Sequence, residues 1–212
     1  MTRTALRRIM GFRWAQLFKS RMFWLLSLPV VVFWRELLRT PADIGAVLPS
    51  SQWLGHAIAA AIPLNSETLV VEVGAGTGAV TRALLRRGVA PSRLCLIERS
   101  SALCELLRRR FPRLLVVRGD AAELTRHLGA DRSVGAIVSS LPLRSLSQAA
   151  VHAIAGEMHA LLDTDGVLVQ YTYGIAEDCP LEAFGFKRQR ASLVLRNIPP
   201  ARIDVLRKEA CL

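Results

Sequence analysis

Apolar, β-branched runs recur from residue 69 onward and alternate with segments of helical pattern. The runs are LVVEV (69–73), LCLIE (94–98), LLVVR (114–118), VGAIVSS (134–140) and GVLVQYTY (166–173). Helical patterns separate them at 81–88, 101–110 and 147–162, and a further helix is expected from about 52 to 61. Nearly continuous apolar strands between amphipathic helices predict a parallel sheet covered on both faces. We therefore expect a doubly wound α/β domain.

The pattern changes near the C-terminus. FKRQRASLVLRN (186–197) and ARIDVLRK (201–208) predict two strands separated by Ile198-Pro199-Pro200, with no helix between them. Consecutive strands joined by a short turn are antiparallel neighbours. The predicted sheet therefore ends in an antiparallel pair.

Residues 1–40 form a basic amphipathic arm in front of one domain at 41–212. Apolar residues from Leu6 to Phe18 recur at three- and four-residue spacing, which predicts a helix with one apolar face. Eight Lys and Arg face a single Glu in residues 1–40, so +7 of the chain's net charge of +11 lies there. This asymmetry predicts a phosphate-bearing partner surface, either nucleic acid or anionic lipid. RTPADIGAVLPSS (39–51) is the candidate linker.

Three interpretations of the arm remain open: a helix that caps the core of the domain, an RNA-binding arm, and a helix that lies in a membrane interface. Its aromatic residues favour lipid over RNA, because so much apolar surface is costly in water; they are Trp14, Phe18, Phe23, Trp24, Phe33 and Trp34. The apolar run 22–34 is shorter than the ~20 residues that a spanning helix needs, and Pro29 interrupts it. Because Arg35-Glu36 follows it rather than a small-residue cleavage site, we expect no signal peptide. We expect a cytoplasmic protein bound peripherally to the inner leaflet of the cytoplasmic membrane.

Three glycines mark the first junction between a strand and a helix, in VEVGAGTGAVT (71–81). Gly74, Gly76 and Gly78 let the backbone approach a ligand and free the amides of a helix N-terminus. With Ala79 the loop also fits a dinucleotide-binding fingerprint. Glu98 ends the next strand, where an acid would hold the ribose hydroxyls of a dinucleotide or of another nucleotide cofactor, so it does not decide between them. Asp120 follows the third strand, where an adenine edge would lie.

VEVGAGTG, IERS and GDA resemble motifs of the class I S-adenosylmethionine methyltransferases, whose seven-stranded sheet also ends in an antiparallel pair. The resemblance implies S-adenosylmethionine as cofactor. It assigns the methionine moiety to Glu72 and the 74–78 loop, the ribose to Glu98, and the adenine to Asp120 and the amide of Ala121. The remaining cofactor contacts that it implies are Ala75, Arg99, Ser139, Ser50 and Ser51. Two alternatives stay open: Glu72 bonds the adjacent helix N-terminus instead, and Ser50 and Ser51 only cap the helix that follows them.

The segment SSLPLRSL (139–146) follows the fourth strand, where N-methyltransferases place the acceptor. Enzymes that methylate amino groups of DNA, RNA or protein often have Asn or Asp, two prolines and an aromatic residue here. This chain has Ser140 in place of the polar residue and Leu143 in place of the aromatic. A flat base would lose its stacking partner, which argues against an rRNA adenine dimethyltransferase.

Four segments together with the basic arm resemble the bacterial phospholipid N-methyltransferases, which convert phosphatidylethanolamine to phosphatidylcholine in three methylations. The segments are IGAVLPSS (44–51), SSLPLRSL, QYTYG (170–174) and RNIPPARIDVLRK (196–208). The resemblance implies a phospholipid substrate and an anionic membrane surface as partners, with no nucleic acid. It places Ser140 and Leu141 at the amine.

Further residues of these segments suit a phospholipid headgroup. Tyr171 and Tyr173 share one side of a strand, where they could accept the cationic headgroup by cation–π contact. Arg144 could pair with the lipid phosphate. Core packing for the tyrosines and a solvated loop charge for the arginine are the alternatives.

No metal is expected. The four cysteines form no CxxC, and the four histidines are scattered, so we interpret His152 and His159 as structural. Two other functions remain open, an RNA methyltransferase and a non-catalytic membrane module that retains a vestigial cofactor fold.

Overall fold

The computed structural model describes residues 52–64, 67–129, 131–175, 178–197 and 199–209. All of them belong to the compact unit Gly45–Leu212. The predicted arm at 1–40 and the predicted cofactor contacts Ser50 and Ser51 lie outside the described residues.

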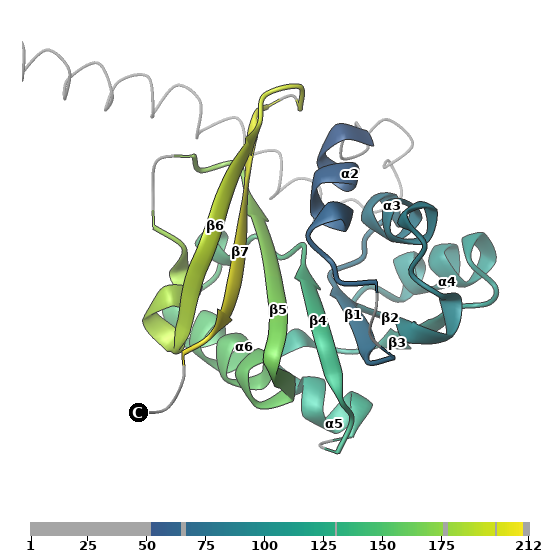
Figure 1. Ribbon diagram of the computed structural model, residues 1–212. Helices are drawn as coiled ribbons and strands as arrows, with labels where there is room; N and C mark the ends of the chain where they lie inside the picture. Colours follow the sequence, from purple (N-terminus) through teal and green to yellow (C-terminus); the bar gives the residue numbers. More distant parts are fainter. Residues whose placement is uncertain (1–51, 65–66, 130, 176–177, 198, 210–212) are drawn as a thin grey trace, which may run out of the picture. The chain divides into compact units, whose positions relative to one another are not determined.

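A seven-stranded sheet with helices on both faces forms this unit, in the order β3-β2-β1-β4-β5-β7-β6 (Figure 1). The strands are β1 Leu69–Val73, β2 Leu94–Glu98, β3 Leu115–Arg118, β4 Val134–Ser139, β5 Leu162–Thr172, β6 Phe186–Val194 and β7 Ala201–Lys208. The α-helices are α2 Gln52–Ala60, α3 Ala79–Arg87, α4 Ser101–Arg110, α5 Leu124–Leu128 and α6 Gln148–Leu161. Short 3₁₀ turns are η2 Pro91–Arg93, η3 Ala121–Glu123, η4 Leu143–Ser145 and η5 Pro180–Phe184.

Strands β3, β2, β1, β4 and β5 are parallel, and β7 is antiparallel to both β5 and β6. Val73 pairs with Ile97 on one side and Ser139 on the other, so the carboxyl ends of three strands meet at one edge. The doubly wound fold with a terminal antiparallel pair is thus confirmed. The residues predicted at strand ends therefore lie along this edge of the sheet: Glu72, Glu98, Asp120 and the segment 139–146.

Successive strand residues pack alternately into two cores, one on each face of the sheet. Val70 and Val138 pack with Leu54 of α2 and with residues of α3 and α4. The neighbouring Val71 and Ile137 pack with α5, α6 and η5. This alternation follows from the two-residue period of a strand. Because both faces of β1, β2 and β4 are covered, these strands are almost entirely apolar, whereas β6 carries exposed polar residues.

Local signals set the helix ends. The Ser100 hydroxyl accepts the N–H of Leu103 at the start of α4, and Ser147 does the same for α6. At the end of α3, Gly88 (φ 106°) donates its N–H to the carbonyls of Leu84 and Leu85. A serine cap contributes about 1 kcal/mol. In the described part of the chain, every helix is too short or too polar to cross a membrane.

Candidate functional site

The glycine loop runs from the end of β1 into α3, and its three glycines have different surroundings. Gly74, Gly76 and Gly78 all have positive φ, at 74°, 56° and 82°. A β-carbon at Gly78 would overlap the ring of Phe111, and one at Gly74 would lie 2.9 Å from Cδ2 of Leu141. At Gly76 its nearest neighbour would be the Gly74 carbonyl oxygen at 3.9 Å. The loop is therefore packed on both flanks and open at Gly76.

Glu98, at the end of β2, ties this loop to the next helix. Its Oε2 accepts the N–H of Gly76 at 2.9 Å, and its Oε1 accepts the N–H of Ser100 at 2.9 Å. The residue is 9% exposed. The carboxylate thus fixes the most open glycine while one edge of it remains accessible.

Asp120, after β3, caps η3. Its Oδ1 accepts the N–H of Ala122 at 3.0 Å, while its Oδ2 lies 3.7 Å from the exposed guanidinium of Arg99. Gly119 donates its N–H to the Glu98 carbonyl at 3.1 Å, which joins the ends of β2 and β3. Ala121 is buried beneath the turn. Three adjacent strand ends therefore present Glu72, Glu98 and Asp120 in spatial order.

Glu72 on β1 is completely buried. Its Oε2 accepts the hydroxyl of Thr81 at 2.7 Å, whereas its Oε1 has no hydrogen-bond partner. Burial raises the pKa of Glu72 to about 8, because the charged form loses its hydration. The predicted alternative, a bond to the start of α3, is therefore real for one oxygen, and the other oxygen is left for a ligand.

The loop after β4 packs directly on the glycine loop. Ser140 donates its N–H to the Val73 carbonyl at 2.9 Å. The amide of Gln170 on β5 donates to the carbonyls of Leu141 at 3.1 Å and Tyr171 at 2.7 Å. Gln170 therefore holds the backbone carbonyl of the predicted acceptor loop in place.

Buried polar atoms without partners are concentrated here. Five such side-chain atoms occur among the described residues, and four belong to this sheet edge: Glu72 Oε1, Ser139 Oγ, Ser140 Oγ and Gln170 Oε1. Ser139 and Gln170 are paired neighbours on β4 and β5. Buried polar groups are nearly always hydrogen-bonded in folded proteins. Their grouping favours a ligand that supplies hydrogen-bond donors at the ends of β1, β4 and β5.

Tyr171 in β5 and Tyr173 just after it pack on the same side of the sheet, as their alternation predicts. Their ring centroids lie 6.0 Å apart in an edge-to-face arrangement. Tyr171 is 7% exposed and packs in the core that includes α2, and burial raises the pKa of Tyr173. Core packing, the alternative, thus describes Tyr171. Tyr173 also packs against this core but is more exposed, and its contact with a headgroup stays a prediction.

Arg144 is the second residue of η4 and has a hydrogen-bond partner within the chain. Its Nη2 donates to the Asp178 carbonyl at 2.5 Å, and its Nε would lie 3.2 Å from a β-carbon at Gly174. Burial and the charge of Arg202 lower the pKa of Arg144. The arginine therefore joins the acceptor loop to the segment after β5, and its pairing with a phosphate stays a prediction.

The two histidines of α6 lie away from these strand ends. His152 stacks on Phe184 with centroids 5.2 Å apart, and His159 meets the edge of Phe186 at 5.4 Å. Over the described ranges, His, Cys, Asp and Glu form no group of three that could hold a metal ion.

Known proteins share this arrangement. A profile described as "Methyltransferase domain" matches residues 70–166. The 1,6-didemethyltoxoflavin-N1-methyltransferase of Burkholderia thailandensis, solved with S-adenosylhomocysteine, superposes with a TM-score of 0.61 at 17% identity over 86% of this chain and 88% of that chain. The ornithine lipid N-methyltransferase of Singulisphaera acidiphila is 31% identical over 181 residues, or 80% of this chain and 91% of that protein. The chain belongs to the class I S-adenosylmethionine-dependent methyltransferases.

This methyltransferase is also similar to ribosomal RNA small subunit methyltransferase A of a Synechococcus strain. The identity is 39% over 95 residues, which are 43% of this chain and 31% of that protein. The match thus spans less than a third of the RNA enzyme.

The site of the methyltransferase fits S-adenosylmethionine by its own features. The space at Gly76 admits a ligand close to the backbone, and Glu72 Oε1 is an unpartnered acceptor suited to an ammonium group. We continue to predict Glu98 for the ribose and Asp120 with the Ala121 amide for the adenine. Ala75, Arg99 and Ser139 remain predicted contacts, with Arg99 mostly exposed and Ser139 fully buried.

Two residues of the methyltransferase site escaped the sequence reasoning. Thr81 and Gln170 are uncharged and lie within a helix and a strand, so neither was given a role although the segments 71–81 and 170–174 contain them. Each acts on a distant position, Thr81 on Glu72 and Gln170 on Leu141. A polar residue inside the apolar run GVLVQYTY is the one signal that would have drawn attention to Gln170.

Proposed function

We propose that this methyltransferase N-methylates phosphatidylethanolamine, and then its mono- and dimethyl forms, to give phosphatidylcholine at a membrane surface. The observation that carries the proposal is the similarity to a protein named as an ornithine lipid N-methyltransferase, which covers 91% of that protein's length. The acceptor loop agrees with it. Leu143 stands where a base-stacking aromatic would be needed, and it is 4% exposed within the core beside α6.

The reaction requires little besides positioning. When bound, S-adenosylmethionine supplies a methyl group made electrophilic by its sulfonium. The neutral amine of the headgroup forms the new N–C bond, the S–C bond breaks, and the amine gives up one proton for each of the first two transfers. The third transfer leaves a quaternary ammonium. Alignment of the amine with the methyl group accounts for most of the acceleration in such a transfer.

The chain's own residues are suited to orient a primary amine. Ser140 Oγ and Gln170 Oε1 are unpartnered acceptors, and the Leu141 carbonyl is already held by the Gln170 amide. A carbonyl has two lone pairs, so Leu141 can accept a further N–H. We propose Tyr173 as a cation–π contact for the methylated headgroup and Arg144 as a partner of its phosphate.

Ornithine lipid is a second candidate substrate, because it is the lipid named for the relative. It also carries a primary amine, but it has no phosphate. Ribosomal RNA is the candidate from the other class, supported by the shorter match.

We further propose that the protein is a cytoplasmic enzyme that binds the inner leaflet through residues 1–40. The basic and aromatic composition of that segment supports this, since such segments combine apolar insertion with attraction to anionic lipid.

The test is transfer of labelled methyl groups from S-adenosylmethionine to purified acceptors. Vesicles of phosphatidylethanolamine, vesicles of ornithine lipid and ribosomal RNA are incubated separately, and the products are resolved by chromatography. We expect label in mono-, di- and trimethylated phosphatidylethanolamine. Label only in ornithine lipid or only in RNA would overturn the proposal, and so would no label at all. Asp120→Ala, which removes a predicted cofactor contact at the end of β3 rather than in the acceptor loop after β4, serves as the inactive control.

A further inference from the structure

Exposed apolar side chains gather at one end of the described domain. Trp53 at the start of α2 is 46% exposed, Leu193 and Leu195 at the end of β6 are 54% and 71% exposed, and Ile175 after β5 is 39% exposed. Leu115, at the start of β3, is the remaining large apolar residue so exposed in the described ranges. We call Trp53, Ile175, Leu193, Leu195 and Arg196 the hairpin-end surface.

Contacts join these residues into one surface. The Arg196 guanidinium lies over the Trp53 ring, 4.7 Å from its centroid, so the end of β6 meets the start of α2. Leu193 pairs across the ladder with Arg202, whose Nη1 donates to the Ile175 carbonyl at 3.0 Å. The hairpin end and α2 lie at the same end of the domain, at the top of Figure 1.

The hairpin-end surface adjoins the proposed acceptor site. Thr172, the last residue of β5, pairs with Arg202. The acceptor loop follows β4 at the same sheet edge, and Gln170 of β5 holds its Leu141 carbonyl. A partner that covers the hairpin-end surface therefore faces the edge where the headgroup must enter.

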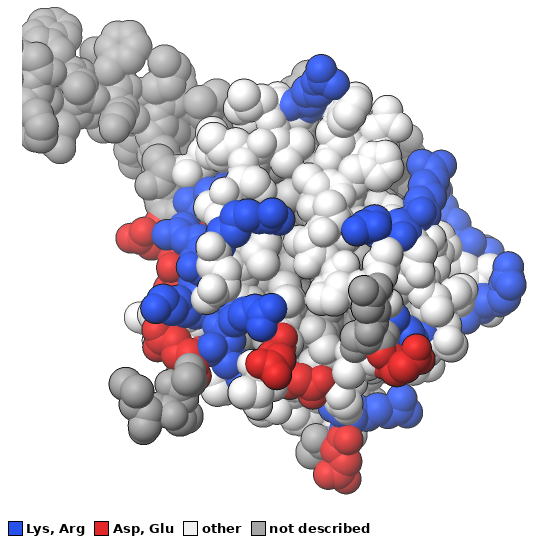
Figure 2. Space-filling view, in the orientation of Figure 1, with Lys and Arg blue, Asp and Glu red and all other residues white. Residues whose placement is uncertain are grey.

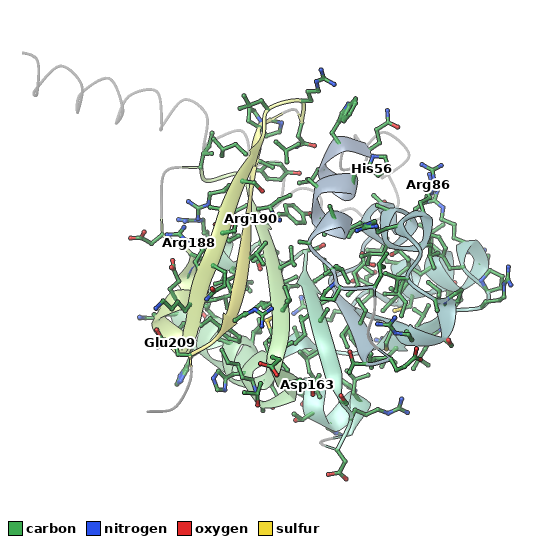
Figure 3. All side chains as sticks on the ribbon, viewed as in Figure 1. His56, Arg86, Asp163, Arg188, Arg190 and Glu209 are labelled. Carbon is green, nitrogen blue, oxygen red and sulfur yellow. The ribbon has the colours of Figure 1, made fainter. Side chains whose placement is uncertain are left out.

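The charge of this region indicates which partner fits. Residues 187–197 contain four basic residues and no acidic one. Arg188 is held by Glu182 and Asp204, whereas Arg190 lies on the exposed part of β6 (Figure 3). In Figure 2 uncharged side chains cover much of the upper part of this face, and acidic ones gather at its left and lower margins. The N-terminal segment 1–51 ends two positions before Trp53 in the sequence, and its first 40 residues carry a net charge of +7.

We propose that an anionic lipid bilayer covers the hairpin-end surface. Leu193, Leu195 and Ile175 enter the acyl boundary, Trp53 lies at headgroup depth, and Arg196 pairs with lipid phosphate. Tryptophan favours this depth, and arginine reaches headgroups from an apolar setting. The inference rests on the proposed function, because it assumes that the enzyme methylates a lipid that remains in the bilayer. It gives the folded domain a membrane contact of its own, separate from residues 1–40.

The first test is vesicle binding by the full-length double variant Leu193→Gln and Leu195→Gln. Both side chains are exposed, so the fold should be kept, which circular dichroism verifies. Removing two half-exposed leucines from the bilayer should weaken partitioning onto vesicles of equal parts phosphatidylcholine and phosphatidylglycerol by roughly tenfold or more. Leu115→Gln, at a leucine of similar exposure on the other edge of the sheet, is the matched control and should bind like the wild type. Equal binding by all three proteins overturns the proposal.

The second test uses Trp53 as a depth probe. Replacing Trp14, Trp24 and Trp34 by phenylalanine leaves Trp53 as the single tryptophan of the chain. Its emission should be that of an exposed ring in buffer, and it should shift to the blue and be quenched by brominated lipids when vesicles are added. Emission that is already blue in buffer and unchanged by vesicles would show that the N-terminal segment or a second copy covers the surface, which overturns the proposal.

A soluble substrate separates this inference from the proposed function. Short-chain phosphatidylethanolamine below its micelle concentration needs no membrane contact. The Leu193→Gln, Leu195→Gln variant should methylate it at the wild-type rate and should lose activity on vesicles. If the wild type methylates neither form, the proposed function fails, while the partitioning and fluorescence results still decide the surface. If the variant keeps its activity on vesicles, the surface proposal alone fails.

Discussion

Replacing Glu72 by glutamine tests whether a neutral carboxyl stands at the end of β1. Burial raises the pKa of Glu72 from its ordinary 4.5 to about 8, while Thr81 lowers it and the nearby Glu98 raises it further. Between these two pH values the native state holds a proton that the unfolded chain has lost. The free energy of unfolding therefore falls as pH rises. This contribution is fully present below pH 4.5 and is lost by the time the pH passes about 8.

The size of the effect follows from the shift. A pH unit corresponds to about 1.4 kcal/mol, so the wild type loses about 3 kcal/mol by pH 7 and about 5 kcal/mol above pH 8. Glutamine has the same shape and does not ionise, and its amide oxygen can still accept the Thr81 hydroxyl. We therefore expect the stability of Glu72→Gln relative to wild type to increase by about 4 kcal/mol between pH 5 and pH 8.

Urea unfolding followed by circular dichroism at several pH values measures this difference. The decisive quantity is how the difference in free energy of unfolding between variant and wild type changes with pH, because a change in packing alters that difference by the same amount at every pH. Glu105→Gln, at an exposed carboxylate on α4, is the matched control and should give a flat difference. A flat difference for Glu72→Gln as well would refute the reasoning. A difference that falls with pH would mean that an ionised, stabilised carboxylate occupies the site.

Three further predictions concern the cofactor loop and the arm. Glu98→Ala and Asp120→Ala should abolish S-adenosylmethionine binding, and calorimetry that shows unchanged affinity would refute these assignments. Gly78→Ala should destabilise the fold by about 2 kcal/mol or more, because its β-carbon overlaps Phe111 and its φ is positive. Gly76→Ala should chiefly weaken cofactor affinity. Thermal melts measure the first effect and calorimetry the second, and equal melting temperatures for both variants would contradict the packing argument. Deleting residues 2–34 should reduce sedimentation with anionic vesicles, and unchanged sedimentation would remove the arm from the membrane interaction.

Most elements could be predicted because their signals are local. The strand at 69–73 and the helix at 101–110 agree with β1 and α4 in both bounds. Strand β5 begins at Leu162 instead of 166, because Asp163 to Asp165 break the apolar pattern where the pairing with β4 is shifted. Helix α5 was not predicted, since five residues are too few to show a helical period.

The candidate site was predictable only in part. The glycines and strand-end acids are recognisable because their spacing is set by the turn from strand to helix. What those acids contact depends on residues far along the chain, as in the bond between Glu98 and the Gly76 amide, 22 positions apart. The sequence likewise predicts two tyrosines on one side of a strand and leaves core packing and headgroup contact open for them; only the structure shows that Tyr171 is buried against the ring of Tyr173.

Some polar atoms of the site are hydrogen-bonded within the chain and others are left for ligands, and the proposed function accounts for the difference. On the cofactor side, Glu98 and Asp120 already accept backbone N–H groups, so the crevice keeps its shape before any ligand binds. Four buried oxygens have no partner: Glu72 Oε1 and Ser139 Oγ among the predicted cofactor contacts, and Ser140 Oγ and Gln170 Oε1 toward the acceptor. Each such atom costs about 1–3 kcal/mol. A neutral primary amine supplies two donors, one each for Ser140 and Gln170, and it loses one N–H in each of the first two methylations, so the fully methylated product leaves these two acceptors unpaired again. The same atoms that orient the substrate would therefore favour release of the quaternary product.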